Sequence, residues 1–180
     1  MVIRPADAQE TVEAWKIALS RRDGPTALIL TRQKLPIINR DRYTSASGLQ
    51  RGAYVLADAP GSKPELILIG TGSEVPILLS AYEQLINQGI QVRVVNVPCW
   101  ELFEMQSKDY HEEVLPSHVN ARLVVEAGCP HGWERYTGAQ GKIIGIERFG
   151  ASAPGEELFQ QFGFTVEHVI KDAKELLSSV

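Results

Sequence analysis

The sequence predicts an α/β protein, a three-layer α/β sandwich in which a mostly parallel sheet lies between helices. Three observations carry this prediction. Residues 66–69 form an unbroken apolar run, which is typical of a strand buried on both faces. Residues 75–85 repeat apolar side chains at helical spacing, and residues 92–97 form a second apolar run rich in β-branched side chains. Strand, helix and strand in this order indicate a βαβ unit.

The first 42 residues contain one predicted helix and one predicted strand. Asp7 and Glu10 have the spacing of a capping box, and apolar side chains share a face, so we expect a helix over residues 8–20. After Gly24 and Pro25, the apolar run 26–31 predicts a strand. Two elements are too few to enclose a core, so this segment is expected to end a larger domain.

Residues 43–64 are rich in Ser, Gly, Ala and Pro and are interpreted as a linker, with a candidate edge strand at residues 54–57. We therefore place a domain boundary near Gly48. The chain then divides into an incomplete unit over residues 1–48 and an α/β domain over residues 49–180.

The second unit continues the alternation of strands and helices. Thr71 and Glu74 have capping-box spacing, Pro76 falls in the first turn of the helix, and Gly89 ends that helix. Further elements are expected at residues 98–115 (one or two short helices), 122–126 and 143–147 (strands), 154–162 (a helix that Gly163 stops) and 166–177 (an amphipathic helix that Thr165 caps).

Composition excludes several classes of protein. Hydrophobic residues make up 44% and charged residues 22% of the 180 residues, which indicates a globular protein with a core. No apolar run approaches the roughly 20 residues of a membrane helix, and no signal-peptide layout is present, so we expect a cytoplasmic protein. The net charge of −4 argues against general nucleic-acid binding. Cys99 and Cys129 are expected to be reduced core thiols.

Arg32 is the strongest candidate binding residue. Side chains just past the carboxyl end of a strand commonly face a ligand crevice, and a guanidinium offers a planar fork for phosphate or carboxylate. The neighbouring Lys34 adds positive charge. A surface salt bridge accounts for Arg32 equally well on physical grounds, so both interpretations stay open.

The other candidates are weaker. The turn Gly70–Ser73 is interpreted as a tight turn rather than a phosphate loop, because the third glycine of the dinucleotide motif is missing. Glu126 and Glu147 both end predicted strands, and solvated strand ends are favoured over a carboxylate pair. Arg4 and Asp7 are interpreted as a helix-start pair. The histidines lack metal-ligand spacing and are interpreted as surface or core residues: His111, His118, His131 and His168.

Five motifs in order give the chain a resemblance to the C-terminal third of transketolase. They are Arg4-Pro5-Ala6-Asp7 with Trp15, Asp23 to Gln33, Gly70 to Val75, Gly132-Trp133 with Tyr136, and Phe149 to Pro154. The resemblance implies the end of a pyrimidine-binding domain over residues 1–48 and a C-terminal domain over residues 49–180. It also implies that Arg32 helps to bind the substrate phosphate.

The same resemblance implies the activity of the parent enzyme. Transketolases are homodimers that move a two-carbon ketol unit between sugar phosphates in the pentose phosphate or Calvin pathways, with thiamine diphosphate and Mg²⁺ or Ca²⁺. The residues that bind the cofactor and metal, and the family's catalytic histidines, belong to regions upstream of residue 1. A fragment that is inactive alone is therefore expected. Two alternatives stay open: an assembly module that pairs with a separate N-terminal polypeptide, and a regulatory domain that binds a small ligand at Gly70–Ser73.

Overall fold

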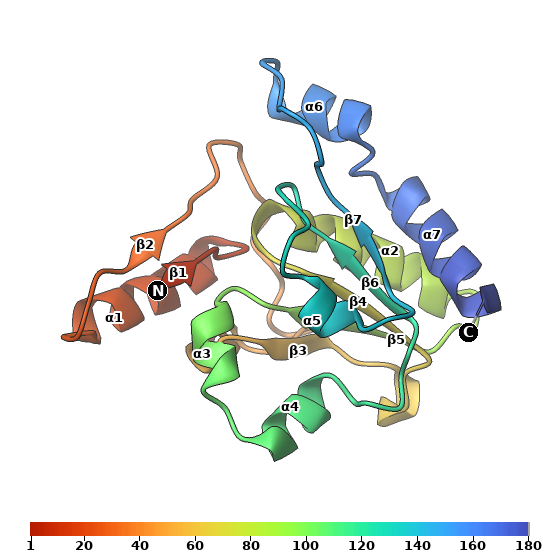
Figure 1. Cartoon of the computed structure of the whole chain (residues 1–180), viewed down its shortest axis with the longest axis horizontal. Coiled ribbons are helices and arrows are strands. Elements are labelled where there is room, and N and C mark those ends of the chain that lie inside the picture. The colour runs from red at the N-terminus through yellow and green to blue at the C-terminus, as the bar shows by residue number, and fades with distance from the viewer. Residues whose placement is uncertain (180) are drawn as a thin grey trace.

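The computed structural model describes residues 1–179 and contains two sheets (Figure 1). A small parallel sheet pairs β1 (Val2–Ile3) with β2 (Ala27–Leu28), and α1 (Ala8–Ser20) connects the two strands. The larger sheet has five strands in the order β3-β5-β4-β6-β7. These strands are β3 (Tyr54–Ala57), β4 (Leu66–Gly70), β5 (Val92–Asn96), β6 (Arg122–Val125) and β7 (Lys142–Ile144).

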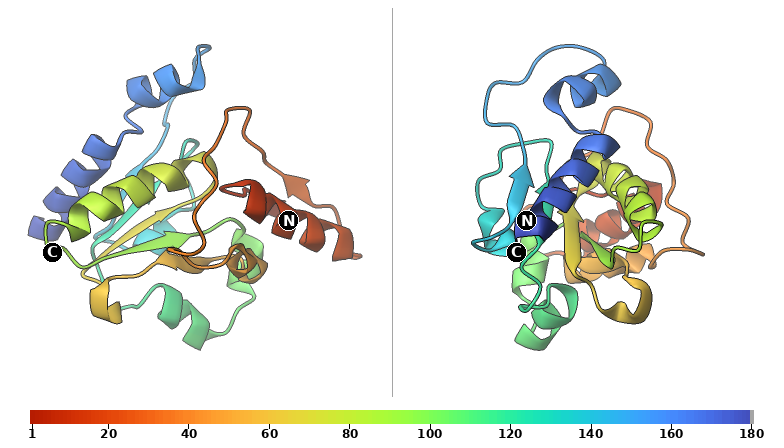
Figure 2. Two further views of the ribbon diagram at one scale, coloured as in Figure 1. Left: turned by 180° about the vertical axis from the view of Figure 1, so that it is seen from behind. Right: turned by 90° about the vertical axis from the view of Figure 1, so that its right-hand side faces the viewer.

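Helices cover both faces of the larger sheet, which confirms the predicted three-layer α/β sandwich. Only the pair β3 and β5 is antiparallel, so β3 is the edge strand expected at residues 54–57. One face packs against α2 (Val75–Ile86) and α7 (Val166–Ser179), which lie side by side (Figure 2). The other face packs against three short helices: α3 (Trp100–Glu104), α4 (Lys108–Val114) and α5 (Glu134–Thr137).

The βαβ unit over β4, α2 and β5 forms as predicted, but the capping box at its turn does not. Every residue of β4 is buried, and Pro76 occupies the first turn of α2. The hydroxyl of Thr71 donates instead to the carbonyl of Arg4, and the Glu74 carboxylate accepts a hydrogen bond from the Arg4 guanidinium. The 3₁₀ turn η3 (Gly72–Glu74) therefore leads into α2.

The strand predicted at residues 26–31 is wrong in length, because β2 spans only Ala27–Leu28. Its partner β1 is also two residues long. The last hydrogen bond between the two segments runs from Ile29 N to the carbonyl of Ile3. Arg32 therefore follows four residues after the strand. The expectation for Cys129 is also wrong: Cys99 is buried but Cys129 is exposed.

The C-terminal helices match their predictions closely. α6 (Gly155–Phe162) ends at Gly163, which is left-handed at φ 81°. Thr165 Oγ1 accepts from His168 N in the first turn of α7. Among the described residues, no helix is long and apolar enough to cross a membrane.

The segment before β3 forms a small core that it shares with the chain around the start of α3. Ile3, Ala14 and Leu49 are fully buried and pack with Cys99. Leu49 belongs to the 3₁₀ helix η1 (Ala46–Arg51), which contacts α1. On the outside, this segment exposes seven large apolar side chains: Val2, Val12, Trp15, Leu19, Ile29, Leu30 and Ile37. The apolar face predicted for α1 is therefore uncovered.

Candidate functional site

The carboxyl edge of the larger sheet is the place where such folds usually bind ligands. β4 lies between β5 and β6, so the chain leaves β4 toward one side and leaves β6 toward the other. Open α/β sheets bind ligands in the crevice at this switch point. In this chain the segment that precedes α1 lies there, because Arg4 N donates to the carbonyl of Pro98 and Thr71 donates to the carbonyl of Arg4.

The Arg4 guanidinium joins two carboxylates at this edge. It lies 3.0 Å from Glu74 Oε1 and also pairs with Glu126, the residue that follows β6. Glu74 is fully buried and Glu126 is 8% exposed. Burial of the guanidinium opposes its charge, but the charges of Glu74 and Glu126 prevail and raise the pKa of Arg4. Burial raises the pKa of Glu126, and the neighbouring Glu74 charge adds to that rise while Arg4 opposes it.

Two predictions are corrected by this arrangement. Arg4 is not part of a helix-start pair with Asp7, because it reaches across to the larger sheet. Glu126 is not a solvated strand end, because it is buried against Arg4. Glu147 is exposed, in agreement with the solvated interpretation, although it lies three residues past the end of β7, and the carboxylate beside Glu126 is Glu74.

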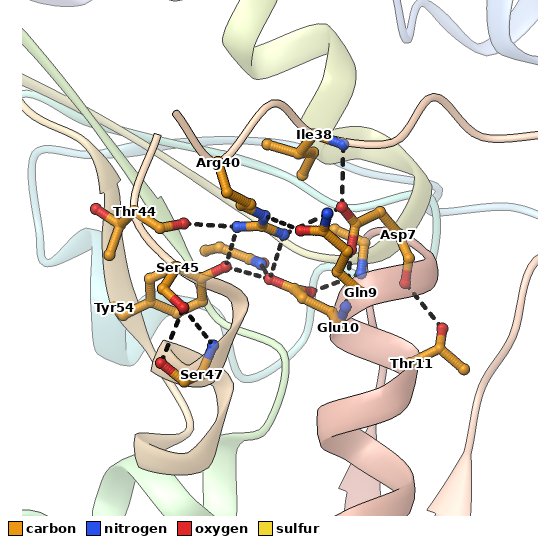
Figure 3. Close-up of polar contacts among 12 residues, drawn as sticks. Asp7, Gln9, Glu10, Thr11, Ile38, Arg40, Thr44, Ser45, Ser47 and Tyr54 are labelled. Carbon is orange, nitrogen blue, oxygen red and sulfur yellow. Dashed lines mark hydrogen bonds and ion pairs between the residues drawn. The ribbon is translucent and has the colours of Figure 1, made fainter. Parts of the chain in front are cut away.

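A second polar network fixes α1 to the same edge (Figure 3). Glu10 is fully buried and accepts from Asn96 Nδ2 at 2.6 Å, from Ala6 N at 2.7 Å and from the Tyr54 hydroxyl. Asp7 caps α1 by accepting from Glu10 N at 2.8 Å, as predicted.

Arg40 completes this network. Its guanidinium donates to the Tyr54 hydroxyl at 3.1 Å and to Asp7 Oδ2 at 3.2 Å, and it lies 3.8 Å from Glu10. Burial raises the pKa of Glu10, against the hydrogen bonds from Tyr54 and Ala6 N and the charge of Arg40. Burial and the Glu10 charge likewise raise the pKa of Tyr54.

These contacts link residues that are distant in the sequence. Arg4 and Glu126 are separated by 122 positions, and Glu10 and Asn96 by 86. The capping spacing of Asp7 and Glu10 is the one sequence pattern that points to these networks. It predicts the bond between these two residues but not their contacts with Asn96 and Arg40. Both networks bind the segment before β3 to the larger sheet.

The turn Gly70–Ser73 does not fit an anion. A Cβ on Gly72 would lie 3.2 Å from Arg4 Nη2, so the guanidinium already lies against the turn. A diphosphate there would displace Arg4 and approach the carboxylates of Glu74 and Glu126, which would repel it. Residues 1–179 also hold no group of three His, Cys, Asp or Glu suited to a metal ion. The residues of this turn therefore do not fit a diphosphate.

Arg32 is exposed in the loop that follows β2. This loop and the loop before α6 rise on the same side of the molecule (Figure 1). Next to Arg32, Gln33 lies against Gly155, where a Cβ would come within 1.9 Å of Nε2. The structure thereby brings Gln33, the last residue of the motif Asp23 to Gln33, to Gly155, the residue that follows the motif Phe149 to Pro154.

The histidines are not gathered in one place. His111 stacks on the ring of Phe103 at 4.2 Å, and its Nε2 lies 2.9 Å from the Phe103 carbonyl. His168 Nδ1 lies 2.8 Å from the carbonyl of Gly163. His118 and His131 are exposed. The first two serve packing and helix ends, in agreement with the interpretation as surface or core residues.

Comparison with known proteins decides the family. The model of the transketolase-like TK C-terminal domain matches residues 52–165. The chain belongs to the transketolase-like C-terminal domain family. This match begins after the boundary predicted near Gly48, which itself stays a prediction.

Whole transketolases are similar to this chain along its length. The transketolase of Halalkalibacterium halodurans is 52% identical over 178 residues, which is 99% of this chain and 27% of that protein. A Pichia stipitis transketolase crystallised with sedoheptulose-7-phosphate has a TM-score of 0.87 and 37% identity, covering 98% of this chain and 25% of that one. The chain thus spans about a quarter of these relatives, and the resemblance to the C-terminal part of transketolase is confirmed.

A more distant solved structure shares the fold alone. It is described as a split gene transketolase, an inactive beta4 tetramer, and it has a TM-score of 0.74 at 18% identity. The likeness covers 98% of this chain and 57% of that one.

Proposed function

We propose that this chain is the C-terminal portion of a transketolase that transfers a two-carbon ketol unit between sugar phosphates. The observation that carries the proposal is the uncovered apolar surface of the segment before β3. α1 exposes 51% of Trp15 and 69% of Leu19, and β2 is followed by the exposed Ile29 and Leu30. Several large apolar side chains exposed on one segment mark a surface that another part of a protein covers. The Halalkalibacterium halodurans transketolase, which is 52% identical, is matched over 27% of its length, and we propose that its remainder corresponds to that part.

The proposal assigns residues 1–48 to the end of a pyrimidine-binding domain and residues 49–180 to a C-terminal domain. Thiamine diphosphate and Mg²⁺ or Ca²⁺ bind in the remainder of the subunit and its homodimer, where the cofactor supplies the electron sink for ketol transfer. The parent enzyme acts in the pentose phosphate or Calvin pathways. Arg32 binds the phosphate of the sugar substrate, and its exposed guanidinium supports this role.

A second candidate function is an assembly module that pairs with a separate N-terminal polypeptide. The same uncovered face of α1 supports it, because a second chain would bury these side chains as well as a covalently joined domain would. A split gene transketolase with this fold is known among solved structures. Both candidates require a partner for residues 1–48 and differ only in whether the partner is covalently attached.

Ketol transfer from xylulose 5-phosphate to ribose 5-phosphate tests the proposal. We expect no activity from the chain alone with thiamine diphosphate and magnesium. Activity is expected when the N-terminal remainder of the Halalkalibacterium halodurans enzyme is added or fused. Activity of the chain alone contradicts the proposed inactivity, and a silent mixture that light scattering shows to have assembled contradicts the proposed function.

The role of Arg32 is tested in the active mixture. Arg32→Ala is expected to raise KM for both sugar phosphates about 10- to 100-fold, because a charge-assisted bidentate contact is lost. Arg22→Ala is the matched control, since Arg22 is also exposed and precedes β2. An unchanged KM for the Arg32 variant removes Arg32 from the site.

A further inference from the structure

The loop that carries Arg32 comes close to the second unit at Gly155. We call residues 31–36 the Arg32 loop. At Gly155, the first residue of α6, an ideal Cβ would lie 1.9 Å from Gln33 Nε2 and 2.7 Å from both Cγ and Cδ. Any side chain at position 155 would therefore occupy the space of the Gln33 side chain. Glycine at this position admits the contact.

The rest of the Arg32 loop is not packed tightly against the second unit. A cavity of about 350 Å³ lies between the loop and the starts of two helices. Its walls are Gln33 to Pro36 on the loop side, Ser73, Pro76 and Ile77 on the α2 side, and Gly155, Glu156 and Phe159 on the α6 side. Gln33 approaches Gly155 at the α6 side of this cavity.

A long side chain on a loop binds weakly unless the loop is held in place. Ordering a flexible arginine on binding costs free energy, and a loop that is already fixed in place avoids this cost. A displacement of about 1 Å in a positioning element can cost roughly 100-fold in rate. The neighbour of Arg32 is therefore the residue best placed to control its affinity for a ligand.

We propose that Gln33, through its packing contact with Gly155, is a positioning residue that keeps Arg32 where the substrate phosphate binds. The C-terminal domain thus contributes to sugar-phosphate affinity without touching the substrate. This inference rests on the proposed function, in which Arg32 binds that phosphate. It predicts a specific defect: substitution at Gly155 weakens binding of phosphorylated substrates and leaves the chemistry itself intact.

The test uses a full-length chimera in which this chain replaces the matching C-terminal part of the Halalkalibacterium halodurans transketolase. Gly155→Ala is expected to raise KM for xylulose 5-phosphate about ten-fold, with kcat within about two-fold, because one positioned contact is lost. KM for erythrulose, a ketose donor without phosphate, is expected to stay unchanged. Gly150→Ala is the matched control, because a Cβ at Gly150 meets nothing within 4 Å.

A double-mutant cycle separates positioning from general damage. If the added Cβ acts by displacing Gln33, then Gly155→Ala has no further effect once Gln33→Ala has removed that side chain. Additive increases in KM overturn the inference, as does an equal rise in KM for erythrulose. If Arg32→Ala changes KM but Gly155→Ala does not, this inference fails while the proposed function stands. If Arg32→Ala changes nothing, the proposed role of Arg32 fails.

A second measurement needs no activity and uses the chain alone. Trypsin cuts after Arg32 and Lys34, and the rate of cutting reports how often the loop opens. Gly155→Ala leaves the cleavage sequence intact and is expected to speed cutting at these two sites several-fold, whereas Gly150→Ala does not. Equal rates in the two variants overturn the inference even if the chimera is inactive.

Discussion

Glu10 accepts a 2.6 Å hydrogen bond from the side-chain amide of Asn96, although 86 positions separate the two residues. Glu10 lies in the first turn of α1, and Asn96 ends β5 of the larger sheet. Both side chains are fully buried. This contact, together with the Arg4 pairs, makes the segment before β3 an integral part of the structure of residues 1–179.

Removal of the Glu10 carboxylate is expected to destabilise the chain strongly. Glu10→Ala leaves the Asn96 amide, the Tyr54 hydroxyl and Ala6 N without their acceptor. Each buried donor left unpaired costs about 1–3 kcal/mol, so we expect a loss of roughly 3 kcal/mol or more in the free energy of unfolding. Urea unfolding measures it. Lys16→Ala, on the exposed side of α1, is the control and should change stability by about 0.5 kcal/mol or less.

The stability of the chain should decrease as the pH rises, because Glu10 loses its proton. Burial raises the pKa of Glu10 above its ordinary 4.5, so the folded state keeps a proton that the unfolded state releases. This contribution to stability is complete below pH 4.5 and is lost as pH rises through the raised pKa. The difference in unfolding free energy between wild type and Glu10→Gln should therefore decrease over that window. Parallel pH profiles for the two proteins would show that Glu10 titrates normally.

Loss of the Arg4 guanidinium should be costly for a different reason. Arg4→Met leaves the buried carboxylates of Glu74 and Glu126 without a cation, which typically costs about 3–5 kcal/mol. Arg21→Met is the control, because Arg21 pairs with the exposed Asp23 at 2.9 Å, and a solvent-screened pair of this kind contributes little to stability. Equal losses of unfolding free energy in the two variants would show that the buried ion pairs of Arg4 stabilise the chain no more than the exposed pair of Arg21 does.

The sequence predicts the sandwich well because its signals are local. Apolar runs mark β4 and β5, helical spacing marks α2 and α7, and Gly163 stops α6 as expected. The polar networks could not be predicted in this way, because Arg4, Glu74 and Glu126 come from three distant segments. Thr71 and Glu74 are the clearest example. They have the spacing of a capping box, but both side chains form hydrogen bonds with Arg4 instead.

Substitution of Gly52 is expected to destabilise the chain strongly, because its backbone conformation disfavours a side chain and its neighbours leave no room for one. It has φ +84°, and a Cβ would lie 2.1 Å from Phe103 N and 2.5 Å from the Cys99 carbonyl. Gly61 shares the left-handed conformation at φ +78° but has nothing within 4 Å. Gly61→Ala should cost about 1 kcal/mol from backbone strain alone. Gly52→Ala should cost at least about 3 kcal/mol in the same unfolding assay, because backbone atoms must move as well. Similar losses at the two positions would contradict the clash at Gly52.

We propose that the uncovered face of α1 binds the remainder of a transketolase subunit. The most direct measurement is size-exclusion chromatography with light scattering of the chain mixed with the N-terminal remainder of the Halalkalibacterium halodurans enzyme. We expect co-elution in equal amounts, and we expect Trp15→Glu to abolish it, because Trp15 is 51% exposed on that face. Elution of the wild-type chain as a separate, monodisperse monomer would contradict the claim.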